Sequence, residues 1–207
     1  MFTKKLVTVA TTLALGCGFI FGLTPASADS DHSSVNLTAN SSFEKQQQVN
    51  NYSVGHQQII DDAIYTITTT LNNTSLVKTN LTLDNEEELD ASNLFVFCYI
   101  QDKHAYVIGH LPAGDSTLRW NGSEGVGNLE WNDGEFPGTK TDEDYWILEP
   151  TVEKDTYYIK NKKNPDYVLD VHDGKTTNGT PLKAAKKQDT NNPYKAAQIF
   201  KLKTIYK

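Results

Sequence analysis

The chain has 207 residues, with 19 basic and 26 acidic side chains and a net charge of −7. This length allows one domain of ordinary size, or one domain with a tail. The acidic balance argues against partners that present a phosphate backbone or an anionic lipid surface, so nucleic acid is not an expected partner.

The first 28 residues have the pattern of a secretory signal peptide. A basic start, MFTKK, precedes the apolar stretch LVTVATTLALGCGFIFGL, and TPASA ends in small residues before Asp29. This order of regions is typical of cleaved signals, so we expect a secreted, extracellular protein with a bacterial type of signal. A retained membrane anchor and a lipoprotein signal at Cys17 are the alternatives. No other segment is apolar enough to span a bilayer.

Removal of this segment leaves 17 basic and 26 acidic residues, a net charge of −9, and Cys98 as the remaining cysteine. No internal disulfide is then expected. Cys98 lies within LFVFCYI, where a small buried hydrophobic residue is the main interpretation; a reactive thiol or an intermolecular bridge is the alternative.

Residues 29–58 are rich in Ser, Asn and Gln and have almost no apolar periodicity, which predicts a flexible polar leader. From residue 59 to 207 the pattern of residue types changes. Short runs of β-branched and aromatic residues alternate with a period near two and are bounded by Gly, Asn, Asp or Pro. These runs predict an all-β domain of many short strands, closed as a barrel or sandwich.

Two markers recur three times in this domain. The triplet Tyr-x-Ile begins at Tyr65, Tyr106 and Tyr157, with spacings of 41 and 51 residues. A second marker, which ends in an aromatic residue, appears as NLF (93–95), DYW (144–146) and QIF (198–200). Three units of about 40 to 55 residues, each with four short strands, predict a pseudo-threefold barrel.

The third unit resembles a repeat of the ricin B-type (R-type) lectin β-trefoil. The matching segments are LDV at Leu169–Val171, NGT at Asn178–Thr180 and the closing Gln-x-aromatic at Gln198–Phe200. Two other segments, NLFVFCYIQDKHAYVI and STLRWN, are similar to lectin-like domains of bacterial toxin and toxin-associated proteins. The resemblance covers about residues 59–207 and implies a β-trefoil with three pseudo-symmetric repeats. It also implies that Phe95, Trp146 and Phe200 are core residues.

The resemblance implies a sugar site in the third unit, where an Asp accepts hydrogen bonds from two adjacent hydroxyls and an aromatic ring stacks on the sugar. The matching Asp is Asp170. The ring expected at position 184 or 185 is replaced by alanine, and Ala197 replaces the Asn that usually precedes the Gln. A substitute ring would come from His172 or Tyr194. The candidate sugar-binding residues are Asp170, His172, Asp173, Asn178, Tyr194 and Gln198. In the alternative interpretation, Asp170 only anchors its loop through backbone N–H groups.

The second unit has Arg119 where the third has Asp170, which reverses the charge. Trp120 and Trp131 lie near one loop region and are candidates for an aromatic-lined sugar pocket. The alternative is that both rings pack into the barrel. The first unit has Val77 and Lys78 at the corresponding place, so no site is expected there.

Catalytic signatures are absent, and the histidines lack metal-ligand spacing, so we expect no enzyme activity, no metal and no cofactor. The acidic run DNEEELD (84–90) is interpreted as a solvated loop, with calcium binding as the alternative. The predicted function is that of a secreted lectin-like protein that binds glycans on a cell surface or polysaccharide. A role as a targeting or accessory subunit of a toxin partner is also compatible with the resemblance. The alternative is a protein-binding trefoil, an inhibitor or assembly subunit, with degenerate sugar sites.

Overall fold

The computed structural model describes residues 59, 63–85, 89–111, 116–133 and 140–206. The predicted signal peptide and polar leader, residues 1–58, lie outside these residues. The described ranges contain twelve strands and four short 3-10 helices. The strands are β1 (Ile64–Thr69), β2 (Leu76–Val77), β3 (Leu83–Asp84), β4 (Phe95–Ile100), β5 (Ala105–His110), β6 (Thr117–Trp120), β7 (Leu129–Asn132), β8 (Trp146–Pro150), β9 (Thr156–Asn161), β10 (Tyr167–Val171), β11 (Leu182–Lys186) and β12 (Phe200–Tyr206). The 3-10 helices are η1 (Ala91–Asn93), η2 (Asp142–Asp144), η3 (His172–Gly174) and η4 (Pro193–Gln198).

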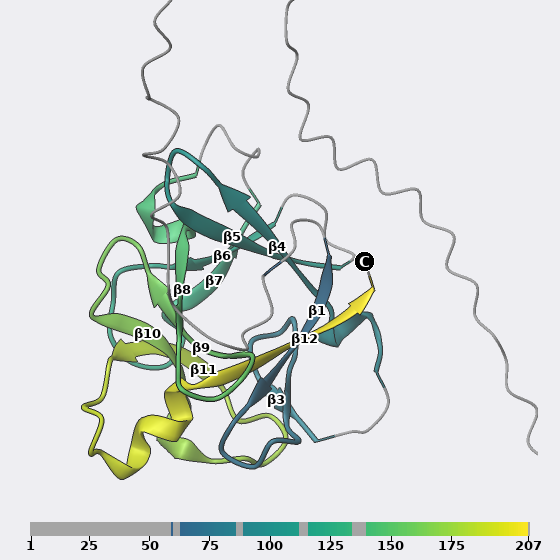
Figure 1. The fold of residues 1–207 in the computed structure, drawn as a ribbon, viewed down its shortest axis with the longest axis vertical. Helices are drawn as coiled ribbons and strands as arrows, with labels where there is room; N and C mark the ends of the chain where they lie inside the picture. Colours follow the sequence, from purple (N-terminus) through teal and green to yellow (C-terminus); the bar gives the residue numbers. More distant parts are fainter. Residues whose placement is uncertain (1–58, 60–62, 86–88, 112–115, 134–139, 207) are drawn as a thin grey trace, which may run out of the picture. The chain divides into compact units, whose positions relative to one another are not determined.

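Six of the strands form a closed antiparallel barrel. Around the ring, β1 pairs with β4, β4 with β5, β5 with β8, β8 with β9, β9 with β12, and β12 with β1. Figure 1 shows the last of these steps, with the C-terminal strand β12 lying beside β1. Closure gives every barrel strand a partner on both sides, which protects backbone groups that an open edge would expose.

The remaining strands form one hairpin in each unit. The hairpins are β2–β3, β6–β7 and β10–β11, and they continue from the barrel strands β1, β5 and β9. The chain therefore consists of three consecutive four-stranded units, residues 64–100, 105–150 and 156–206. This is a β-trefoil, and the predicted fold is confirmed.

The repeated aromatic residues meet in register at the centre of the barrel. The registered pairs are Tyr65 with Phe95, Tyr106 with Trp146, and Tyr157 with Phe200. Phe95, Trp146 and Phe200 are at most 1% exposed. Large rings of this kind bury more apolar area than any other side chains, so one such pair per unit accounts for much of the shared core.

Cys98 packs with Ile100 and Ile147 against a second, smaller cluster of buried residues around Val107 and Tyr145. This is the packing role predicted for it. No helix in the described part of the chain is long and apolar enough to cross a membrane.

Hydrogen bonds between units tie the three hairpins into a ring. The tie from the second unit to the first is the indole N–H of Trp131, which donates to the Thr79 carbonyl at 2.6 Å. The other two ties are Asn128 to Ala184, from the second unit to the third, and Gly179 to Leu83, from the third unit to the first. Each hairpin is therefore held by both of its neighbours.

The tie at Asn128 satisfies two buried backbone groups at once. Its side-chain amide donates to the Ala184 carbonyl and accepts from the Ala184 N–H, both at 2.8 Å. Asn128 is fully buried and Ala184 is 1% exposed, so water does not replace these bonds easily. One asparagine thus takes the place of a neighbouring strand beside β11.

We expect Asn128→Ala to lower the free energy of unfolding by about 2–5 kcal/mol, because it leaves the buried N–H and carbonyl of Ala184 without partners. Denaturant unfolding of the purified protein measures this change. The control is Asn191→Ala, at an exposed position, where we expect a change within about 0.5 kcal/mol. A loss for Asn128→Ala no larger than that of the control would contradict the tie.

Candidate functional site

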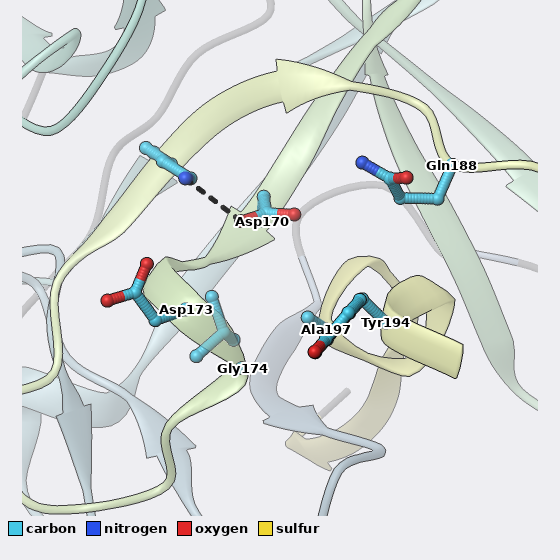
Figure 2. A pocket seen from close by; sticks show the side chains of 8 residues that line it. Asp170, Asp173, Gly174, Gln188, Tyr194 and Ala197 are labelled. Atoms are coloured by element: carbon cyan, nitrogen blue, oxygen red, sulfur yellow. Dashed lines mark ion pairs between the residues drawn. The ribbon is translucent and has the colours of Figure 1, made fainter. Parts of the chain in front are cut away.

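A hollow of about 350 Å³ opens in the third unit, between the β10–β11 hairpin, η3 and η4. Figure 2 shows Asp170 at its centre, with Asp173 and Gly174 on one side and Tyr194 and Ala197 on the other. Four elements of one unit therefore build the hollow, and the inter-unit ties hold the β11 side of it in place.

Asp170 is held from below by Gln198. The Gln198 Nε2 donates to Asp170 Oδ2 at 2.9 Å and to the Lys186 carbonyl at 2.9 Å, and its Oε1 accepts from the Gln188 N–H at 2.7 Å. Gln198 is fully buried, so all of its polar atoms depend on these partners. Of these two predicted site residues, Asp170 lines the hollow, whereas Gln198 contacts Asp170 and does not itself line it.

The second oxygen of the Asp170 carboxylate is less engaged. Its Oδ1 lies 3.8 Å from the Nζ of Lys183, the residue that faces Asp170 in the β10–β11 register. Burial raises the pKa of Asp170, while the Gln198 hydrogen bond and the Lys183 charge act in the opposite direction. No backbone N–H of the described residues donates to this carboxylate, which argues against the loop-anchoring alternative.

The loop after β10 turns back through two left-handed residues. Asp173 has a φ of 55° and Gly174 a φ of 63°, and Asp and Gly tolerate this region better than most residues. The Asp173 carboxylate lines the hollow and accepts from Lys175 Nζ at 3.1 Å. That hydrogen bond holds the pKa of Asp173 below its ordinary value, so Asp173 is ionised at neutral pH.

Tyr194 supplies an aromatic ring on the opposite wall. Pro193 starts η4, and the Asn192 side chain caps it by accepting the Tyr194 N–H at 2.8 Å. The Tyr194 side chain lines the hollow and is 66% exposed, an unusual exposure for a large ring. Of the two predicted substitutes for the missing ring, Tyr194 is the one that the structure places here.

Two other predicted residues of this unit do not line the hollow. His172 starts η3, and its backbone N–H donates to the Pro181 carbonyl at 3.0 Å. Its buried Nδ1 lies 3.4 Å from Asp173 Oδ1 but makes no hydrogen bond with the described residues. The Asn178 side chain accepts the Asn85 N–H at 2.7 Å. Asn178 thus joins the third unit to the first, a structural role that its turn sequence alone does not reveal.

The two second-unit tryptophans also lie away from the hollow. Trp120 is 5% exposed, stacks on Tyr167 with 4.5 Å between ring centroids, and donates to the Ser123 carbonyl. Trp131 is half-buried and stacks on Phe95 with centroids 6.5 Å apart. Both rings have the packing role that was the alternative prediction for them.

Lys183 and Gln188 line the hollow and were not among the predicted residues. Lys183 lies opposite Asp170 in the hairpin, so a correct register would have identified it from the sequence. Gln188 follows β11 in a loop, and its sequence carries no comparable signal. Ala184, one of the two positions expected to hold a ring, is a buried core residue.

The equivalent positions in the other units carry the opposite charge. In the second unit, Arg119 faces Glu130 across the hairpin and lies 3.7 Å from the buried Asp144. In the first unit, Lys78 forms an ion pair with Asp84 at 2.7 Å. Asp84 begins the acidic run that was predicted to be solvated, yet it is 4% exposed. Of the three units, the third therefore has the carboxylate at this position.

No group of three or more His, Cys, Asp or Glu side chains within the described ranges is arranged to hold a metal ion. The side chains that line the hollow can offer a ligand hydrogen bonds, ion pairs and an aromatic ring.

The fold is similar to those of solved lectins and of a toxin. The Macrolepiota procera ricin B-like lectin in complex with lactose has a TM-score of 0.55 and 17% identity, over 72% of this chain and 99% of that chain. SeviL bound to asialo-GM1 saccharide has a TM-score of 0.51 and 21% identity, over 70% of this chain and 99% of that chain. A mosquitocidal holotoxin has a TM-score of 0.59 and 19% identity, over 70% of this chain and 18% of that chain.

The resemblance to the R-type lectin β-trefoil is thus confirmed at the level of the fold, and the chain spans less than a fifth of the holotoxin. The similar structures also include two glycosidases, in which the chain covers at most 33% of the length. No model of a protein family and no curated protein sequence matches the chain.

The raised pKa of Asp170 gives a prediction for stability. Its protonated form favours folding below the ordinary pKa of 3.8, and this contribution is lost as the pH rises through the folded-state pKa. The ionised carboxylate is therefore a cost to folding at neutral pH. We expect Asp170→Asn to raise the free energy of unfolding at about pH 7 but not at about pH 3.

Chemical denaturation at both pH values measures this difference. Asp189→Asn, at an exposed position, makes the same change in net charge and is the matched control. An equal gain in the free energy of unfolding at both pH values, or a gain at neutral pH no larger than that of the control, would show that the ionised Asp170 does not destabilise the folded protein.

Proposed function

We propose that this protein is a carbohydrate-binding, lectin-like protein that uses the third-unit hollow and acts without catalysis. The observation that carries the proposal is the Asp170 carboxylate, fixed by the buried Gln198 and accessible from a hollow that Tyr194 borders. A sugar ring has hydroxyls along its edge and an apolar face. It therefore requires a hydrogen-bond acceptor and an aromatic surface together.

The solved structures support this proposal through their printed ligands. The Macrolepiota procera lectin binds lactose and SeviL binds an asialo-GM1 saccharide, each on a fold similar to this chain. This chain covers almost the whole length of both proteins. Because the shared identity is low, the ligand of this chain follows from its own hollow and not from theirs.

We further propose that the protein is secreted and binds glycans on a cell surface or polysaccharide. The signal-like residues 1–28 support export. The similarity to part of a mosquitocidal holotoxin supports a role as a targeting or accessory subunit of a toxin. A single shallow site binds weakly, so tight attachment to a surface would require several chains acting together.

We expect Asp170→Asn to weaken glycan binding at least about tenfold, because it removes a charge-assisted acceptor while leaving the size of the side chain unchanged. A glycan array followed by titration calorimetry on the best ligand measures the loss. Asp189→Asn is the control and should bind as the wild type does. If the wild type binds a glycan and Asp170→Asn binds it equally well, the sugar site lies elsewhere.

We expect Tyr194→Ala to weaken binding about three- to tenfold, because it removes the aromatic face of the hollow. The ring is 66% exposed, so its loss should leave the unfolding midpoint almost unchanged. Tyr194→Phe keeps the ring and should retain most of the affinity. Equal losses for both variants would assign the effect to the phenol hydroxyl and contradict stacking. Failure of the wild type to bind any glycan would favour the protein-binding alternative.

A further inference from the structure

The third unit carries a charge opposite to that of the other two. Residues 64–100 contain one lysine and five acidic residues, a net charge of −4, and residues 105–150 contain two basic and nine acidic residues, a net charge of −7. Residues 156–206 contain ten lysines and four acidic residues, a net charge of +6. The net charge of the whole chain conceals this difference. The hollow therefore lies in a basic unit of an acidic protein.

One of these lysines is part of the hollow itself. Lys183 lines it, and its Nζ lies 3.8 Å from Asp170 Oδ1, which is beyond hydrogen-bonding distance. The side chain is 21% exposed, so the ammonium is accessible to a ligand and only loosely paired. An acceptor for hydroxyls and a cationic donor thus stand side by side, close enough for neighbouring groups of one sugar ring.

Other lysines lie on the elements that border the hollow. Lys175 follows η3, pairs with Asp173 and has a side chain that is 62% exposed. Lys186 is exposed on β11, and Lys195 follows Tyr194 on η4, where its Nζ donates to a backbone carbonyl at 2.5 Å. Neither Lys186 nor Lys195 has a carboxylate partner among the described residues. The charged side chains that line the hollow are two acids and Lys183, and these further lysines add positive charge to the elements that build it.

We propose that the third-unit hollow binds an anionic glycan, a sugar that carries a carboxylate or sulfate group. This inference rests on the proposed function. The sugar hydroxyls donate to Asp170, the ring packs on Tyr194, and the acidic group accepts from Lys183. The surrounding lysines attract such a ligand over about one Debye length, roughly 8 Å at physiological ionic strength.

A flat anionic membrane or a phosphate backbone fits this arrangement less well. Asp170 lies at the centre of the hollow and would repel a phosphate placed there, whereas a sugar ring presents hydroxyl donors to the same carboxylate. A mixed lining of acceptor, cation and ring is suited to an acidic sugar and not to a uniform negative charge.

The test is a titration of the full secreted chain with pairs of glycans that differ only in an acidic group, such as lactose and sialyllactose, or a neutral oligosaccharide and its sulfated derivative. We expect the acidic member to bind about three- to tenfold more tightly, and most of this preference to disappear at about 0.5 M salt. Lys183→Gln should abolish the preference for the acidic member over the neutral one. Lys201→Gln, on an exposed β12 residue outside the hollow, makes the same charge change and should keep the preference.

The outcomes separate this inference from the proposed function. If both members of every pair bind equally and Asp170→Asn still binds poorly, the proposal of an anionic ligand is overturned, whereas the proposed lectin function is retained. A preference that survives in Lys183→Gln would also overturn it. Binding to phosphatidylserine vesicles without binding to any glycan would overturn both.

Discussion

The hydrogen bonds of the Gln198 amide determine the geometry of the third unit. This fully buried side chain joins Asp170 on β10, the Lys186 carbonyl at the end of β11 and the Gln188 N–H in the following loop. An unpaired buried amide costs about 1–3 kcal/mol per lost partner, so the three segments are held together by the need to satisfy one residue. The same bonds occupy one oxygen of Asp170 and leave the other for a ligand. Core stability and ligand chemistry therefore depend on a single side chain.

The other two units keep a polar residue at this place and change what it contacts. Asn93 and Asp144 precede their closing aromatics as Gln198 does, two residues before, and all three are fully buried. Asp144 accepts a hydrogen bond at 2.7 Å from the side chain of Asn132, which belongs to the same unit. The Nδ2 of Asn93 is buried and has no hydrogen-bond partner among the described residues, and the first unit has a lysine where the third has Asp170. The buried position two residues before the closing aromatic thus accepts Asn, Asp or Gln. Of the three units, the third has a carboxylate at the position of Asp170.

The sequence predicts the framework well because its signals are local and repeated. The Tyr-x-Ile triplets and closing aromatics follow directly from strand pairing, and Asp170 and Gln198 follow from the resemblance. The roles of the tryptophans are harder to predict from the sequence, because the face on which Trp131 lies depends on its pairing with Leu118 across a turn. Lys183 depends in the same way on its register with Asp170, which the left-handed residues of the intervening loop help to set. Long-range register is a property of the folded hairpin, and spacing along the chain does not specify it.

The charge that a ligand experiences also depends on where the charged residues lie in the fold. The acidic net charge of the chain argues against anionic partners, but net charge is a sum over groups that a ligand does not feel equally. Charges beyond about one Debye length are screened, so the hollow responds mainly to the lysines of its own unit. One of these lysines, Lys183, also affects the ionisation of Asp170. Burial raises the pKa of Asp170, and the Lys183 charge opposes that rise, which favours the ionised form of this buried carboxylate. The lysine that offsets the cost of Asp170 is therefore the one placed to select the charge of the ligand.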